Sequence, residues 1–398
     1  MADFNFKKWN LTLGWLAFLI AFISYSLTVE PTVSFWDAGE YILTSSKLQV
    51  GHPPGAPFFQ MMGAFFSIFA SEPSQIGLMI NMMSATASAF TILFMFWSIV
   101  LLIKQVTKSE TEPSKNQNSA ILGAAFVGSL SFAFTDSFWF NAVETEVYAM
   151  ATLILAIMFY LGLRWEKDMF TPRGNKWLIL ISFVVGLSFG VHFMGLLTIP
   201  AISLIYFFKN YKTVTVKNFI LANVAGIAIL LFVFKLLAPN ILRYFSVLEI
   251  FFVNTVGLPF NSGSIIALIL LVGFIYWGLN YTRKKGYVRL NTGLLCITFV
   301  VVGFSSWVML PIRANANVTV NENNPSSARE LLAYYNLEQY PKTHLFYGPQ
   351  FTDQYVGLDE NEPYIDDKPK YEKDEIAGKY VIVNDYKNGL QNYNSEHA

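Results

Sequence analysis

Cysteine and charged residues are scarce in this chain. Its 398 residues include one cysteine, Cys296, which lies in an apolar run, so an intrachain disulfide is excluded and thiol catalysis is not expected. Only 14% of the residues are charged, compared with about 25% in soluble globular domains. The 27 lysines and arginines balance the 27 aspartates and glutamates, so no excess positive charge favours nucleic acid as a partner.

Apolar residues are correspondingly abundant. They make up 54% of the chain, 17% of the residues are aromatic, and the mean hydropathy is +0.42. Apolar runs of about 20 residues follow one another, which predicts an all-α polytopic membrane protein. No small-residue cleavage site follows the first run, so we interpret it as a retained helix rather than a signal peptide.

We predict about nine transmembrane helices. A further apolar stretch, residues 57–70, has only 14 residues and suits an interfacial or re-entrant helix. The nine predicted spans are residues 11–29, 76–103, 120–135, 147–163, 177–191, 193–208, 219–237, 264–281 and 293–310.

The distribution of positive charge predicts the orientation. With residues 57–70 left outside the membrane, the inner loops hold 16 lysines and arginines, and the outer loops as far as Arg313 hold three. Positive residues are enriched on the cytoplasmic side of membrane proteins. We therefore place the N-terminus inside and residues 35–59 outside.

The chain turns polar after the ninth predicted span. We divide it into a transmembrane catalytic domain, residues 1–313, and an outer segment, residues 314–398, which we interpret as a small or incomplete domain. The outer segment contains an amphipathic stretch at residues 328–340 and a β-like run at residues 380–384. No internal repeat is evident.

Polar residues gather on the predicted outer side. The first outer loop contains Asp37 and Glu40, followed by the run His52-Pro-Pro-Gly55. Carboxylates beside a membrane are costly to place, which favours a functional role. The candidate site residues on this side are Asp37, Glu40, His52, Glu144, Glu146, His192, Arg243 and Arg313.

These residue types suit transfer of a group from a lipid phosphate. A carboxylate can take the proton of an acceptor hydroxyl as that hydroxyl attacks a sugar. The leaving phosphate needs a cation, for which arginine is well shaped. The lipid tail would lie between the spans.

Each candidate also has a structural interpretation. Asp37 can cap the helix that follows it, and His52 can be a surface histidine. Glu144 and Glu146 can be solvated at the interface, and His192 can close its turn through hydrogen bonds. Arg313 can extend to the interface. A metal site built from the two histidines and a carboxylate lacks ligand-type spacing, so none is predicted.

Several motifs together resemble a known family. An outer loop with an acidic pair, followed by His-Pro-Pro, resembles the protein O-mannosyltransferases of the GT-C superfamily. The fuller pattern is similar to a bacterial membrane family related to the animal O-mannosyltransferase that modifies plexin-type receptors. The motifs are FWDAGEYI (35–42), GHPPGAPFF (51–59), NAVETEVYAM (141–150), GVHFMG (190–195), GLPFNSG (257–263) and LPIRANANVTVNENNPSS (310–327).

The resemblance implies roles for the candidate residues. It makes Asp37 the catalytic base of an inverting glycosyltransferase, with Glu40 assisting, and places the other candidates around the donor and acceptor. The chain departs from the classical pattern, in which the two acids are adjacent and a lysine follows His-Pro-Pro-Leu-Gly. The phosphate must then be bound elsewhere, and Arg243 and Arg313 are the candidates.

The expected reaction is transfer of a sugar, with mannose the first candidate, from a polyprenyl-phosphate donor to Ser/Thr of exported proteins. The expected location is the bacterial inner membrane, with the site and the C-terminus extracytoplasmic. Beyond the lipid-linked donor no cofactor is predicted, and a divalent metal is left open. Two alternatives remain: an envelope glycolipid or polysaccharide as acceptor, and a lipid-linked sugar transporter or flippase. A transporter would show broken helices and midplane charges.

Overall fold

The computed structural model describes residues 4–107, 114–340, 358–385 and 387–392. Contacts divide the chain into two units, of which unit 1 comprises Met1–Ala238 and Ile275–Glu322 and unit 2 comprises Pro239–Phe274 and Asn323–Ala398. This division groups residues 239–274 with the polar tail, whereas the sequence-based division cuts the chain only after residue 313.

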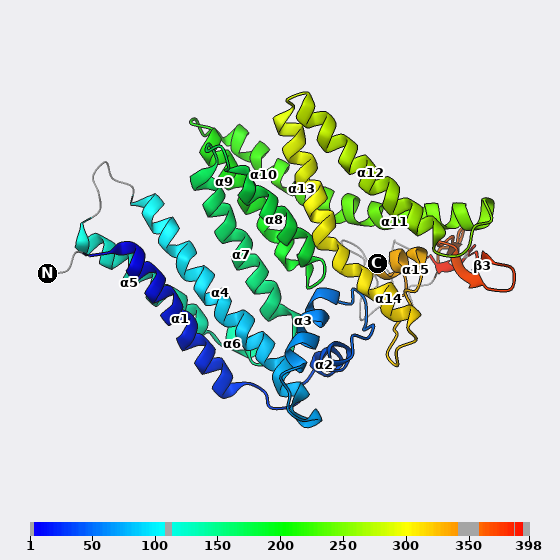
Figure 1. Ribbon diagram of the computed structural model, residues 1–398, viewed down its shortest axis with the longest axis horizontal. Coiled ribbons are helices and arrows are strands. Elements are labelled where there is room, and N and C mark those ends of the chain that lie inside the picture. The colour runs from blue at the N-terminus through cyan, green and yellow to red at the C-terminus, as the bar shows by residue number, and fades with distance from the viewer. Residues whose placement is uncertain (1–3, 108–113, 341–357, 386, 393–398) are drawn as a thin grey trace. The chain divides into compact units, whose positions relative to one another are not determined.

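The regular elements of unit 1 are helices, joined by loops that include one isolated β-bridge between Val50 and Asn321 (Figure 1). Its elements are α1 (Phe6–Thr28), α2 (Ala38–Ser46), α3 (Pro57–Ser67), η1 (Pro73–Gln75), α4 (Ile76–Val106), α5 (Lys115–Ala133), α6 (Asp136–Ala142), α7 (Val147–Asp168), α8 (Asn175–Ser188), η2 (Phe193–Leu197), α9 (Thr198–Asn210), α10 (Val216–Leu231), η3 (Phe232–Leu237), α13 (Val288–Phe304), η5 (Ser305–Val308) and α14 (Met309–Asn315).

Unit 2 combines helices with two small antiparallel strand pairs. α12 (Ser262–Lys284) begins in unit 2 and ends in unit 1. The remaining elements are α11 (Ala238–Ile250), η4 (Phe251–Thr255), α15 (Ala328–Tyr335), β1 (Tyr364–Ile365), β2 (Lys370–Asp374), β3 (Lys379–Asn384) and β4 (Leu390–Gln391), with β1 paired to β4 and β2 to β3.

The predicted polytopic helical fold is confirmed. Seven helices in the described residues are long and apolar enough to cross a membrane, or eight if α5 and α6, bent by 69°, form one span. The fifth predicted span corresponds to α8, which has 14 residues and is shorter than the roughly 20 residues of a typical crossing. The apolar run there continues past Ser188, but the helix does not.

The segment predicted as the third outer loop is helical, and the predicted end of the seventh span is wrong. We expected the seventh span to end at residue 237 and a loop to carry Arg243, but the helical stretch continues from Val216 to Thr255. Two π-helical segments, η3 and η4, flank α11 within it. Widened turns of this kind let a helix continue where hydrogen bonding is irregular, which a hydropathy pattern does not register.

Small residues bring the helices of unit 1 together. Ala17 and Ala21 of α1 pack against Ala85 and Ala89 of α4 in one buried cluster, and Figure 1 shows α1 lying along α4. The Tyr25 hydroxyl donates to the carbonyl of Ala133 in α5, at 2.8 Å. Close approach through small side chains is typical of helix packing in membranes.

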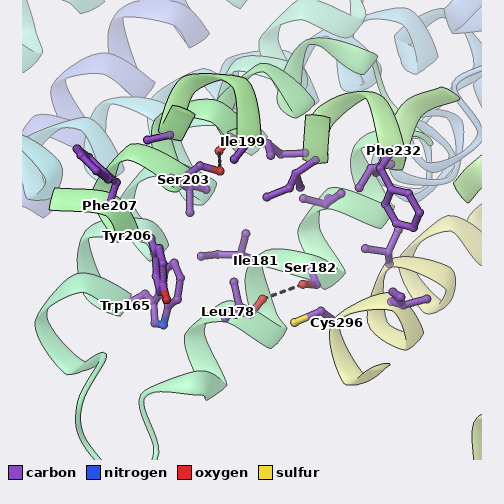
Figure 2. A pocket seen from close by; sticks show the side chains of 18 of the residues that line it. Trp165, Leu178, Ile181, Ser182, Ile199, Ser203, Tyr206, Phe207, Phe232 and Cys296 are labelled. Carbon is purple, nitrogen blue, oxygen red and sulfur yellow. Dashed lines mark hydrogen bonds between the residues drawn. The ribbon is translucent and has the colours of Figure 1, made fainter. Parts of the chain in front are cut away.

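A cavity of about 660 Å³ lies among α8, α9, α10, η3 and α13 (Figure 2). Its lining is mostly aliphatic and aromatic, with Trp165 and Tyr206 stacked at a ring-centroid distance of 5.8 Å. The hydroxyl groups of Ser182 and Ser203 donate to carbonyls of their own helices. The cavity is therefore suited to an apolar occupant.

In unit 2, the tail packs around a buried carboxylate. Glu249 accepts hydrogen bonds from the backbone N–H groups of Asn261 and Ser264, at 2.6 and 2.7 Å, and from the hydroxyl of Tyr380 at 3.1 Å. The β-like run predicted at residues 380–384 is confirmed as β3. The amphipathic stretch predicted from residue 328 is confirmed at its start as α15. The helix of that stretch ends earlier than expected, at Tyr335.

Candidate active site

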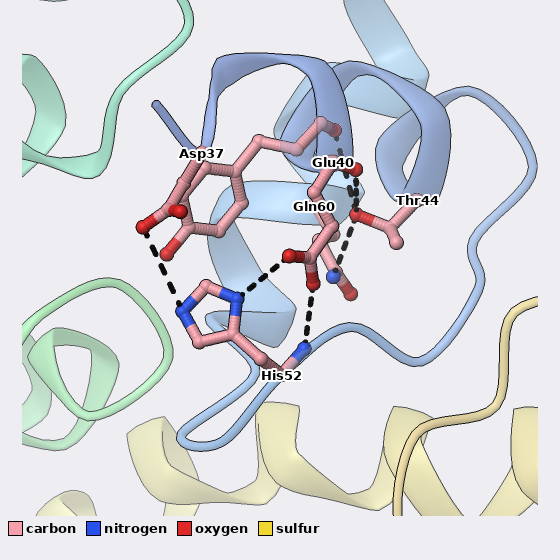
Figure 3. A network of polar contacts seen from close by, with 6 residues as sticks. Asp37, Glu40, Thr44, His52 and Gln60 are labelled. Atoms are coloured by element: carbon pink, nitrogen blue, oxygen red, sulfur yellow. Dashed lines mark hydrogen bonds and ion pairs between the residues drawn. The ribbon is translucent and has the colours of Figure 1, made fainter. Parts of the chain in front are cut away.

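The first loop forms a compact polar network around His52 (Figure 3). His52 Nδ1 lies 2.9 Å from Glu40 Oε2, and the His52 backbone N–H donates to Glu40 Oε1 at 2.6 Å. His52 Nε2 faces Asp37 Oδ2 at 4.0 Å. The two acids expected to act as a pair are therefore separated by an imidazole.

Asp37 is the more accessible of the two acids. It occupies the N-cap position of α2, but its side chain makes no capping hydrogen bond. The side chain is 59% exposed, against 27% for Glu40. Trp36, directly before it, has a left-handed φ of 62°, a backbone conformation that carries strain and clusters at functional sites. The helix-capping interpretation of Asp37 does not describe this geometry.

Glu40 is committed to His52. A Cβ added at Gly51 would lie 2.6 Å from Glu40 Oε1, so the absence of a side chain at Gly51 makes this approach possible. Burial raises the pKa of Glu40, but the hydrogen bonds from His52 outweigh it and leave that pKa below its ordinary value. The same hydrogen bond raises the pKa of His52 against the opposing effect of burial.

The beginning of the polar tail closes the loop from the other side. The Val50 N–H donates to the carbonyl of Val320, and the Glu322 N–H donates to the carbonyl of Val50, each at 3.0 Å. Arg313 donates from Nε to the carbonyl of Leu48 at 2.5 Å and from Nη2 to that of Lys47 at 3.0 Å. These contacts give Arg313 a structural role, and phosphate binding by Arg313 stays a prediction.

The second predicted outer loop lies against the first. The Glu30 N–H donates to the carbonyl of Val143 at 2.9 Å, and Asn81 donates to the carbonyls of Glu30 and Thr32 while accepting from the hydroxyl of Thr145. These bonds fasten the loop of residues 143–146 to the end of α1 and to α4. Neighbouring Glu144 and Glu146 are consequently buried, at 4% and 7% exposure.

Burial changes the titration of these two glutamates. It raises the pKa of Glu144 and raises that of Glu146 to about 7, with the charges of Asp37 and Glu144 adding to the effect on Glu146. Glu146 and Asp37 are thus electrostatically coupled although they come from different loops. This coupling makes Glu146 part of the same polar cluster.

We expect Glu146 to make stability depend on pH. A carboxyl whose pKa is raised by folding favours the folded state when protonated, so its contribution is complete below about pH 4.5 and is lost as the pH rises through about 7. Glu146→Gln should therefore melt at a higher temperature than the parent chain at pH 8 and near the same temperature at pH 5. Thermal melts in detergent measure this, with Glu72→Gln as control. An equal difference at both pH values would contradict it.

His192 lies in the turn between α8 and η2. Its Nδ1 accepts a hydrogen bond from the Met194 N–H at 3.1 Å, and its ring centroid lies 5.4 Å from that of Tyr148. Burial lowers the pKa of His192, which favours the neutral ring. With Nδ1 as acceptor, the remaining proton lies on Nε2. His192 therefore closes its turn, as its structural interpretation expected, and keeps a second nitrogen available.

Two residues of the cluster were missed from the sequence. Tyr41 is 8% exposed and lies 5.8 Å from His52 between ring centroids, and burial followed by the charges of Glu146, Asp37 and Glu40 raises its pKa. Burial and the charge of Glu40 raise the pKa of Glu322. Both residues occur in motifs quoted above. The available signal for Tyr41 was its position directly after Glu40, and that for Glu322 was its position within a run of asparagines.

Arg243 belongs to unit 2, where it is exposed on α11. The structure does not place it relative to Asp37, so phosphate binding by Arg243 stays a prediction. In the described part of the chain, no three His, Cys, Asp or Glu side chains converge as metal ligands would.

A family comparison identifies the part of the chain that carries this cluster. Residues 37–215 match the model described as the protein O-mannosyl-transferase TMEM260 N-terminal domain. This segment is similar to the TMEM260 N-terminal domain family. Residues 341–398 match a second model, described as a family of unknown function (DUF8416). No solved structure matches the chain.

Two curated relatives of the TMEM260 family resemble the chain at low identity. Protein O-mannosyl-transferase tmem260 of Dictyostelium discoideum is 27% identical over 206 residues, which are 49% of this chain and 23% of the relative. Protein O-mannosyl-transferase TMEM260 of Mus musculus is 23% identical over 167 residues, 41% of this chain and 21% of the relative. The matched stretch therefore spans less than a quarter of either relative.

The TMEM260-like segment contains most of the candidate residues. The match to the family begins at Asp37 and includes six of the eight candidate site residues, whereas Arg243 and Arg313 lie beyond its end. The predicted resemblance to an O-mannosyltransferase-like family is confirmed for this segment, in a multi-pass membrane protein.

Proposed function

We propose that this protein is a membrane glycosyltransferase that moves a sugar, mannose in the first instance, from a polyprenyl-phosphate carrier to Ser/Thr hydroxyls of exported proteins. The observation that carries the proposal is the exposed carboxylate of Asp37, which faces His52 at 4.0 Å in the segment similar to O-mannosyl-transferases. Glu144 and Glu146 are buried beside it, so the exposed carboxylate of Asp37 lies at the edge of a shielded polar cluster.

The proposed reaction needs one base and one leaving group. Asp37 accepts the proton of the acceptor hydroxyl while the hydroxyl oxygen attacks the anomeric carbon of the sugar. The bond from that carbon to the phosphate oxygen breaks, and its electron pair leaves with the polyprenyl phosphate. Attack from the face opposite the phosphate inverts the anomeric centre.

The charge distribution supports an extracytoplasmic site. The asymmetry of lysine and arginine favours an orientation in a bacterial cell with residues 35–59 outside and the N-terminus in the cytoplasm. An exported acceptor would meet Asp37 on that side of the inner membrane.

The apolar cavity supports a lipid-linked donor. α8 lines the cavity with Ile181 and Ser182 (Figure 2) and with Val185. The helix ends at Ser188, four residues before His192. A tail in the cavity would lie along the helix that leads to the His192 turn, which suits a donor with an apolar chain and a charged head.

Filling the cavity should weaken binding of a long-chain donor. Ala225→Trp places a bulky side chain in the lining of the cavity, while Val224→Trp, on the same helix but outside the lining, is the matched control. If the tryptophan displaces two methylene groups of the donor tail from the cavity, the lost burial costs about 1.6 kcal/mol of binding free energy, which is roughly a tenfold rise in KM. A ten-carbon donor analogue should be unaffected. Equal effects of both variants on both donors would argue against a tail in this cavity.

Reconstitution tests the function directly. The full chain in proteoliposomes is supplied with radiolabelled polyprenyl-phosphate-mannose and either a secreted protein or envelope lipids as acceptor. We expect label in the protein fraction that β-elimination releases. Label in a lipid product that thin-layer chromatography separates from the donor would favour the glycolipid acceptor, and donor movement across the bilayer without transfer would favour a flippase.

A further inference from the structure

The two acids of the first loop have different surroundings, although the sequence presents them as a pair. Glu40 makes two hydrogen bonds with His52, whereas the Asp37 side chain makes no helix-capping hydrogen bond and is mostly exposed. We propose that Glu40 is a positioning residue, which holds His52 with its Nε2–H directed at Asp37, so that Asp37 alone meets the substrate. This inference rests on the proposed function for the identity of the reaction.

The geometry leaves Glu40 little freedom to act as a base. Its Oε1 accepts the His52 backbone N–H at 2.6 Å and its Oε2 lies 2.9 Å from His52 Nδ1. The helix beneath is also held, because the Thr44 hydroxyl donates to the Glu40 carbonyl at 2.8 Å and accepts from Gln60 Nε2 of α3 at 3.1 Å (Figure 3). Moving the Glu40 carboxylate towards a substrate would leave the His52 N–H without its acceptor, which is costly for a partly buried group.

The hydrogen bond between His52 Nδ1 and Glu40 orients the ring, so that Nε2 is the nitrogen that faces Asp37. A carboxylate beside Nδ1 requires a proton on Nδ1. The groups that act on the ring are Glu40 and Asp37 of the first loop and Glu322 of the tail, and all three are acidic. They favour the imidazolium, which carries a proton on Nε2 as well. His52 then attracts the Asp37 carboxylate through a charged N–H group.

This arrangement assigns a separate task to each residue. Asp37 accepts the proton of the hydroxyl and remains the catalytic residue, while His52 keeps both of its protons and fixes the direction of the carboxylate. Glu40 acts only through His52. The spacing of three residues between the acids follows from this division, because an adjacent acid would point to another side of the helix.

Glu40→Gln tests the inference with a readout independent of catalysis. The glutamine oxygen still accepts the His52 backbone N–H, but its amide N–H group would face Nδ1 and favour the neutral ring. The chain has four histidines, so ¹⁵N-histidine NMR of the full chain in nanodiscs can follow each one, with His52 assigned from His52→Asn. We expect the titration of His52 to move to lower pH in Glu40→Gln and to stay unchanged in the control Glu72→Gln. An unmoved titration would overturn the inference.

The pH profile of transfer provides the second readout. Glu40→Gln should lose activity on the alkaline side first, with the alkaline limb of kcat displaced to lower pH and a loss of about 100-fold where His52 is neutral. A fall in kcat equal at every pH would show a purely structural role and would overturn the inference. If the parent chain transfers no sugar, the proposed function fails, while the NMR titration still decides whether Glu40 holds His52. If Glu40→Gln does not fold, Glu322→Gln should move the His52 titration in the same direction.

Discussion

Replacing Asp37 by asparagine is expected to lower the rate of sugar transfer by about 10²- to 10⁴-fold, the usual contribution of a positioned general base. Asparagine keeps the shape of the side chain but has no oxygen basic enough to accept the hydroxyl proton. The substitution should leave the fold intact, because the Asp37 carboxylate makes no capping bond and is 59% exposed. Transfer of radiolabelled mannose at matched protein concentrations measures the effect.

Asp136→Asn is the matched control for this experiment. Asp136 lies exposed in the first turn of α6, so its replacement removes a charge of the same type without touching the cluster. It should retain the activity of the parent chain. If Asp37→Asn also retains full activity, Asp37 is not the base, and the proposed mechanism is wrong even if the chain transfers sugar.

The largest expected effect on folding comes from Gly186→Val. A Cβ at Gly186 of α8 would lie 2.2 Å from the carbonyl oxygen of Val300 in α13, and one at Gly303 would lie 2.3 Å from the carbonyl oxygen of Phe183. Backbone atoms cannot turn aside as a side chain can, so the two helices must separate. We expect destabilisation by about 3 kcal/mol or more. Thermal melts and the yield of monodisperse protein measure it.

This helix contact also supports the polar cluster. The Phe189 carbonyl, just beyond α8, accepts from Trp307 Nε1 at 2.9 Å, and the Gly190 carbonyl accepts from the Phe59 N–H of α3 at 3.0 Å. Gly186→Val should therefore reduce activity in whatever protein folds. Gly123→Val is the control, because a Cβ there would meet nothing within 4 Å. Comparable melting temperatures for the two variants would show that the close contact is not needed.

Hydropathy predicted the helices more reliably than their ends. A run of apolar residues is sufficient to predict a helix in a membrane, because every backbone polar group must be satisfied within it. The pattern could not show that α8 stops at Ser188 or that the helical stretch from Val216 continues to Thr255. Those ends depend on local hydrogen bonding and on packing against neighbours.

For the candidate site, the sequence identified the loops that carry the polar residues but not which of these residues contact one another. Asp37, Glu40 and His52 were recognised because carboxylates and a histidine beside long apolar runs are unusual. Tyr41 and Glu322 carried only the weaker signals of their positions, directly after Glu40 and within a run of asparagines, since a tyrosine and an acid in a polar tail are ordinary. Arg313 was predicted to bind the phosphate, and the sequence did not show that its guanidinium also holds the backbone of Lys47 and Leu48.

The sequence by itself determined that this protein is a polytopic helical membrane protein and that its first loop carries the acids, because apolar length and local residue type are properties of short segments. Only the tertiary structure decided that His52 stands between Asp37 and Glu40, that Glu40 is engaged by His52 while Asp37 is exposed, and that Glu146 is coupled to Asp37. These facts depend on contacts that form only when the chain folds, and the spacing of residues along the sequence does not contain them.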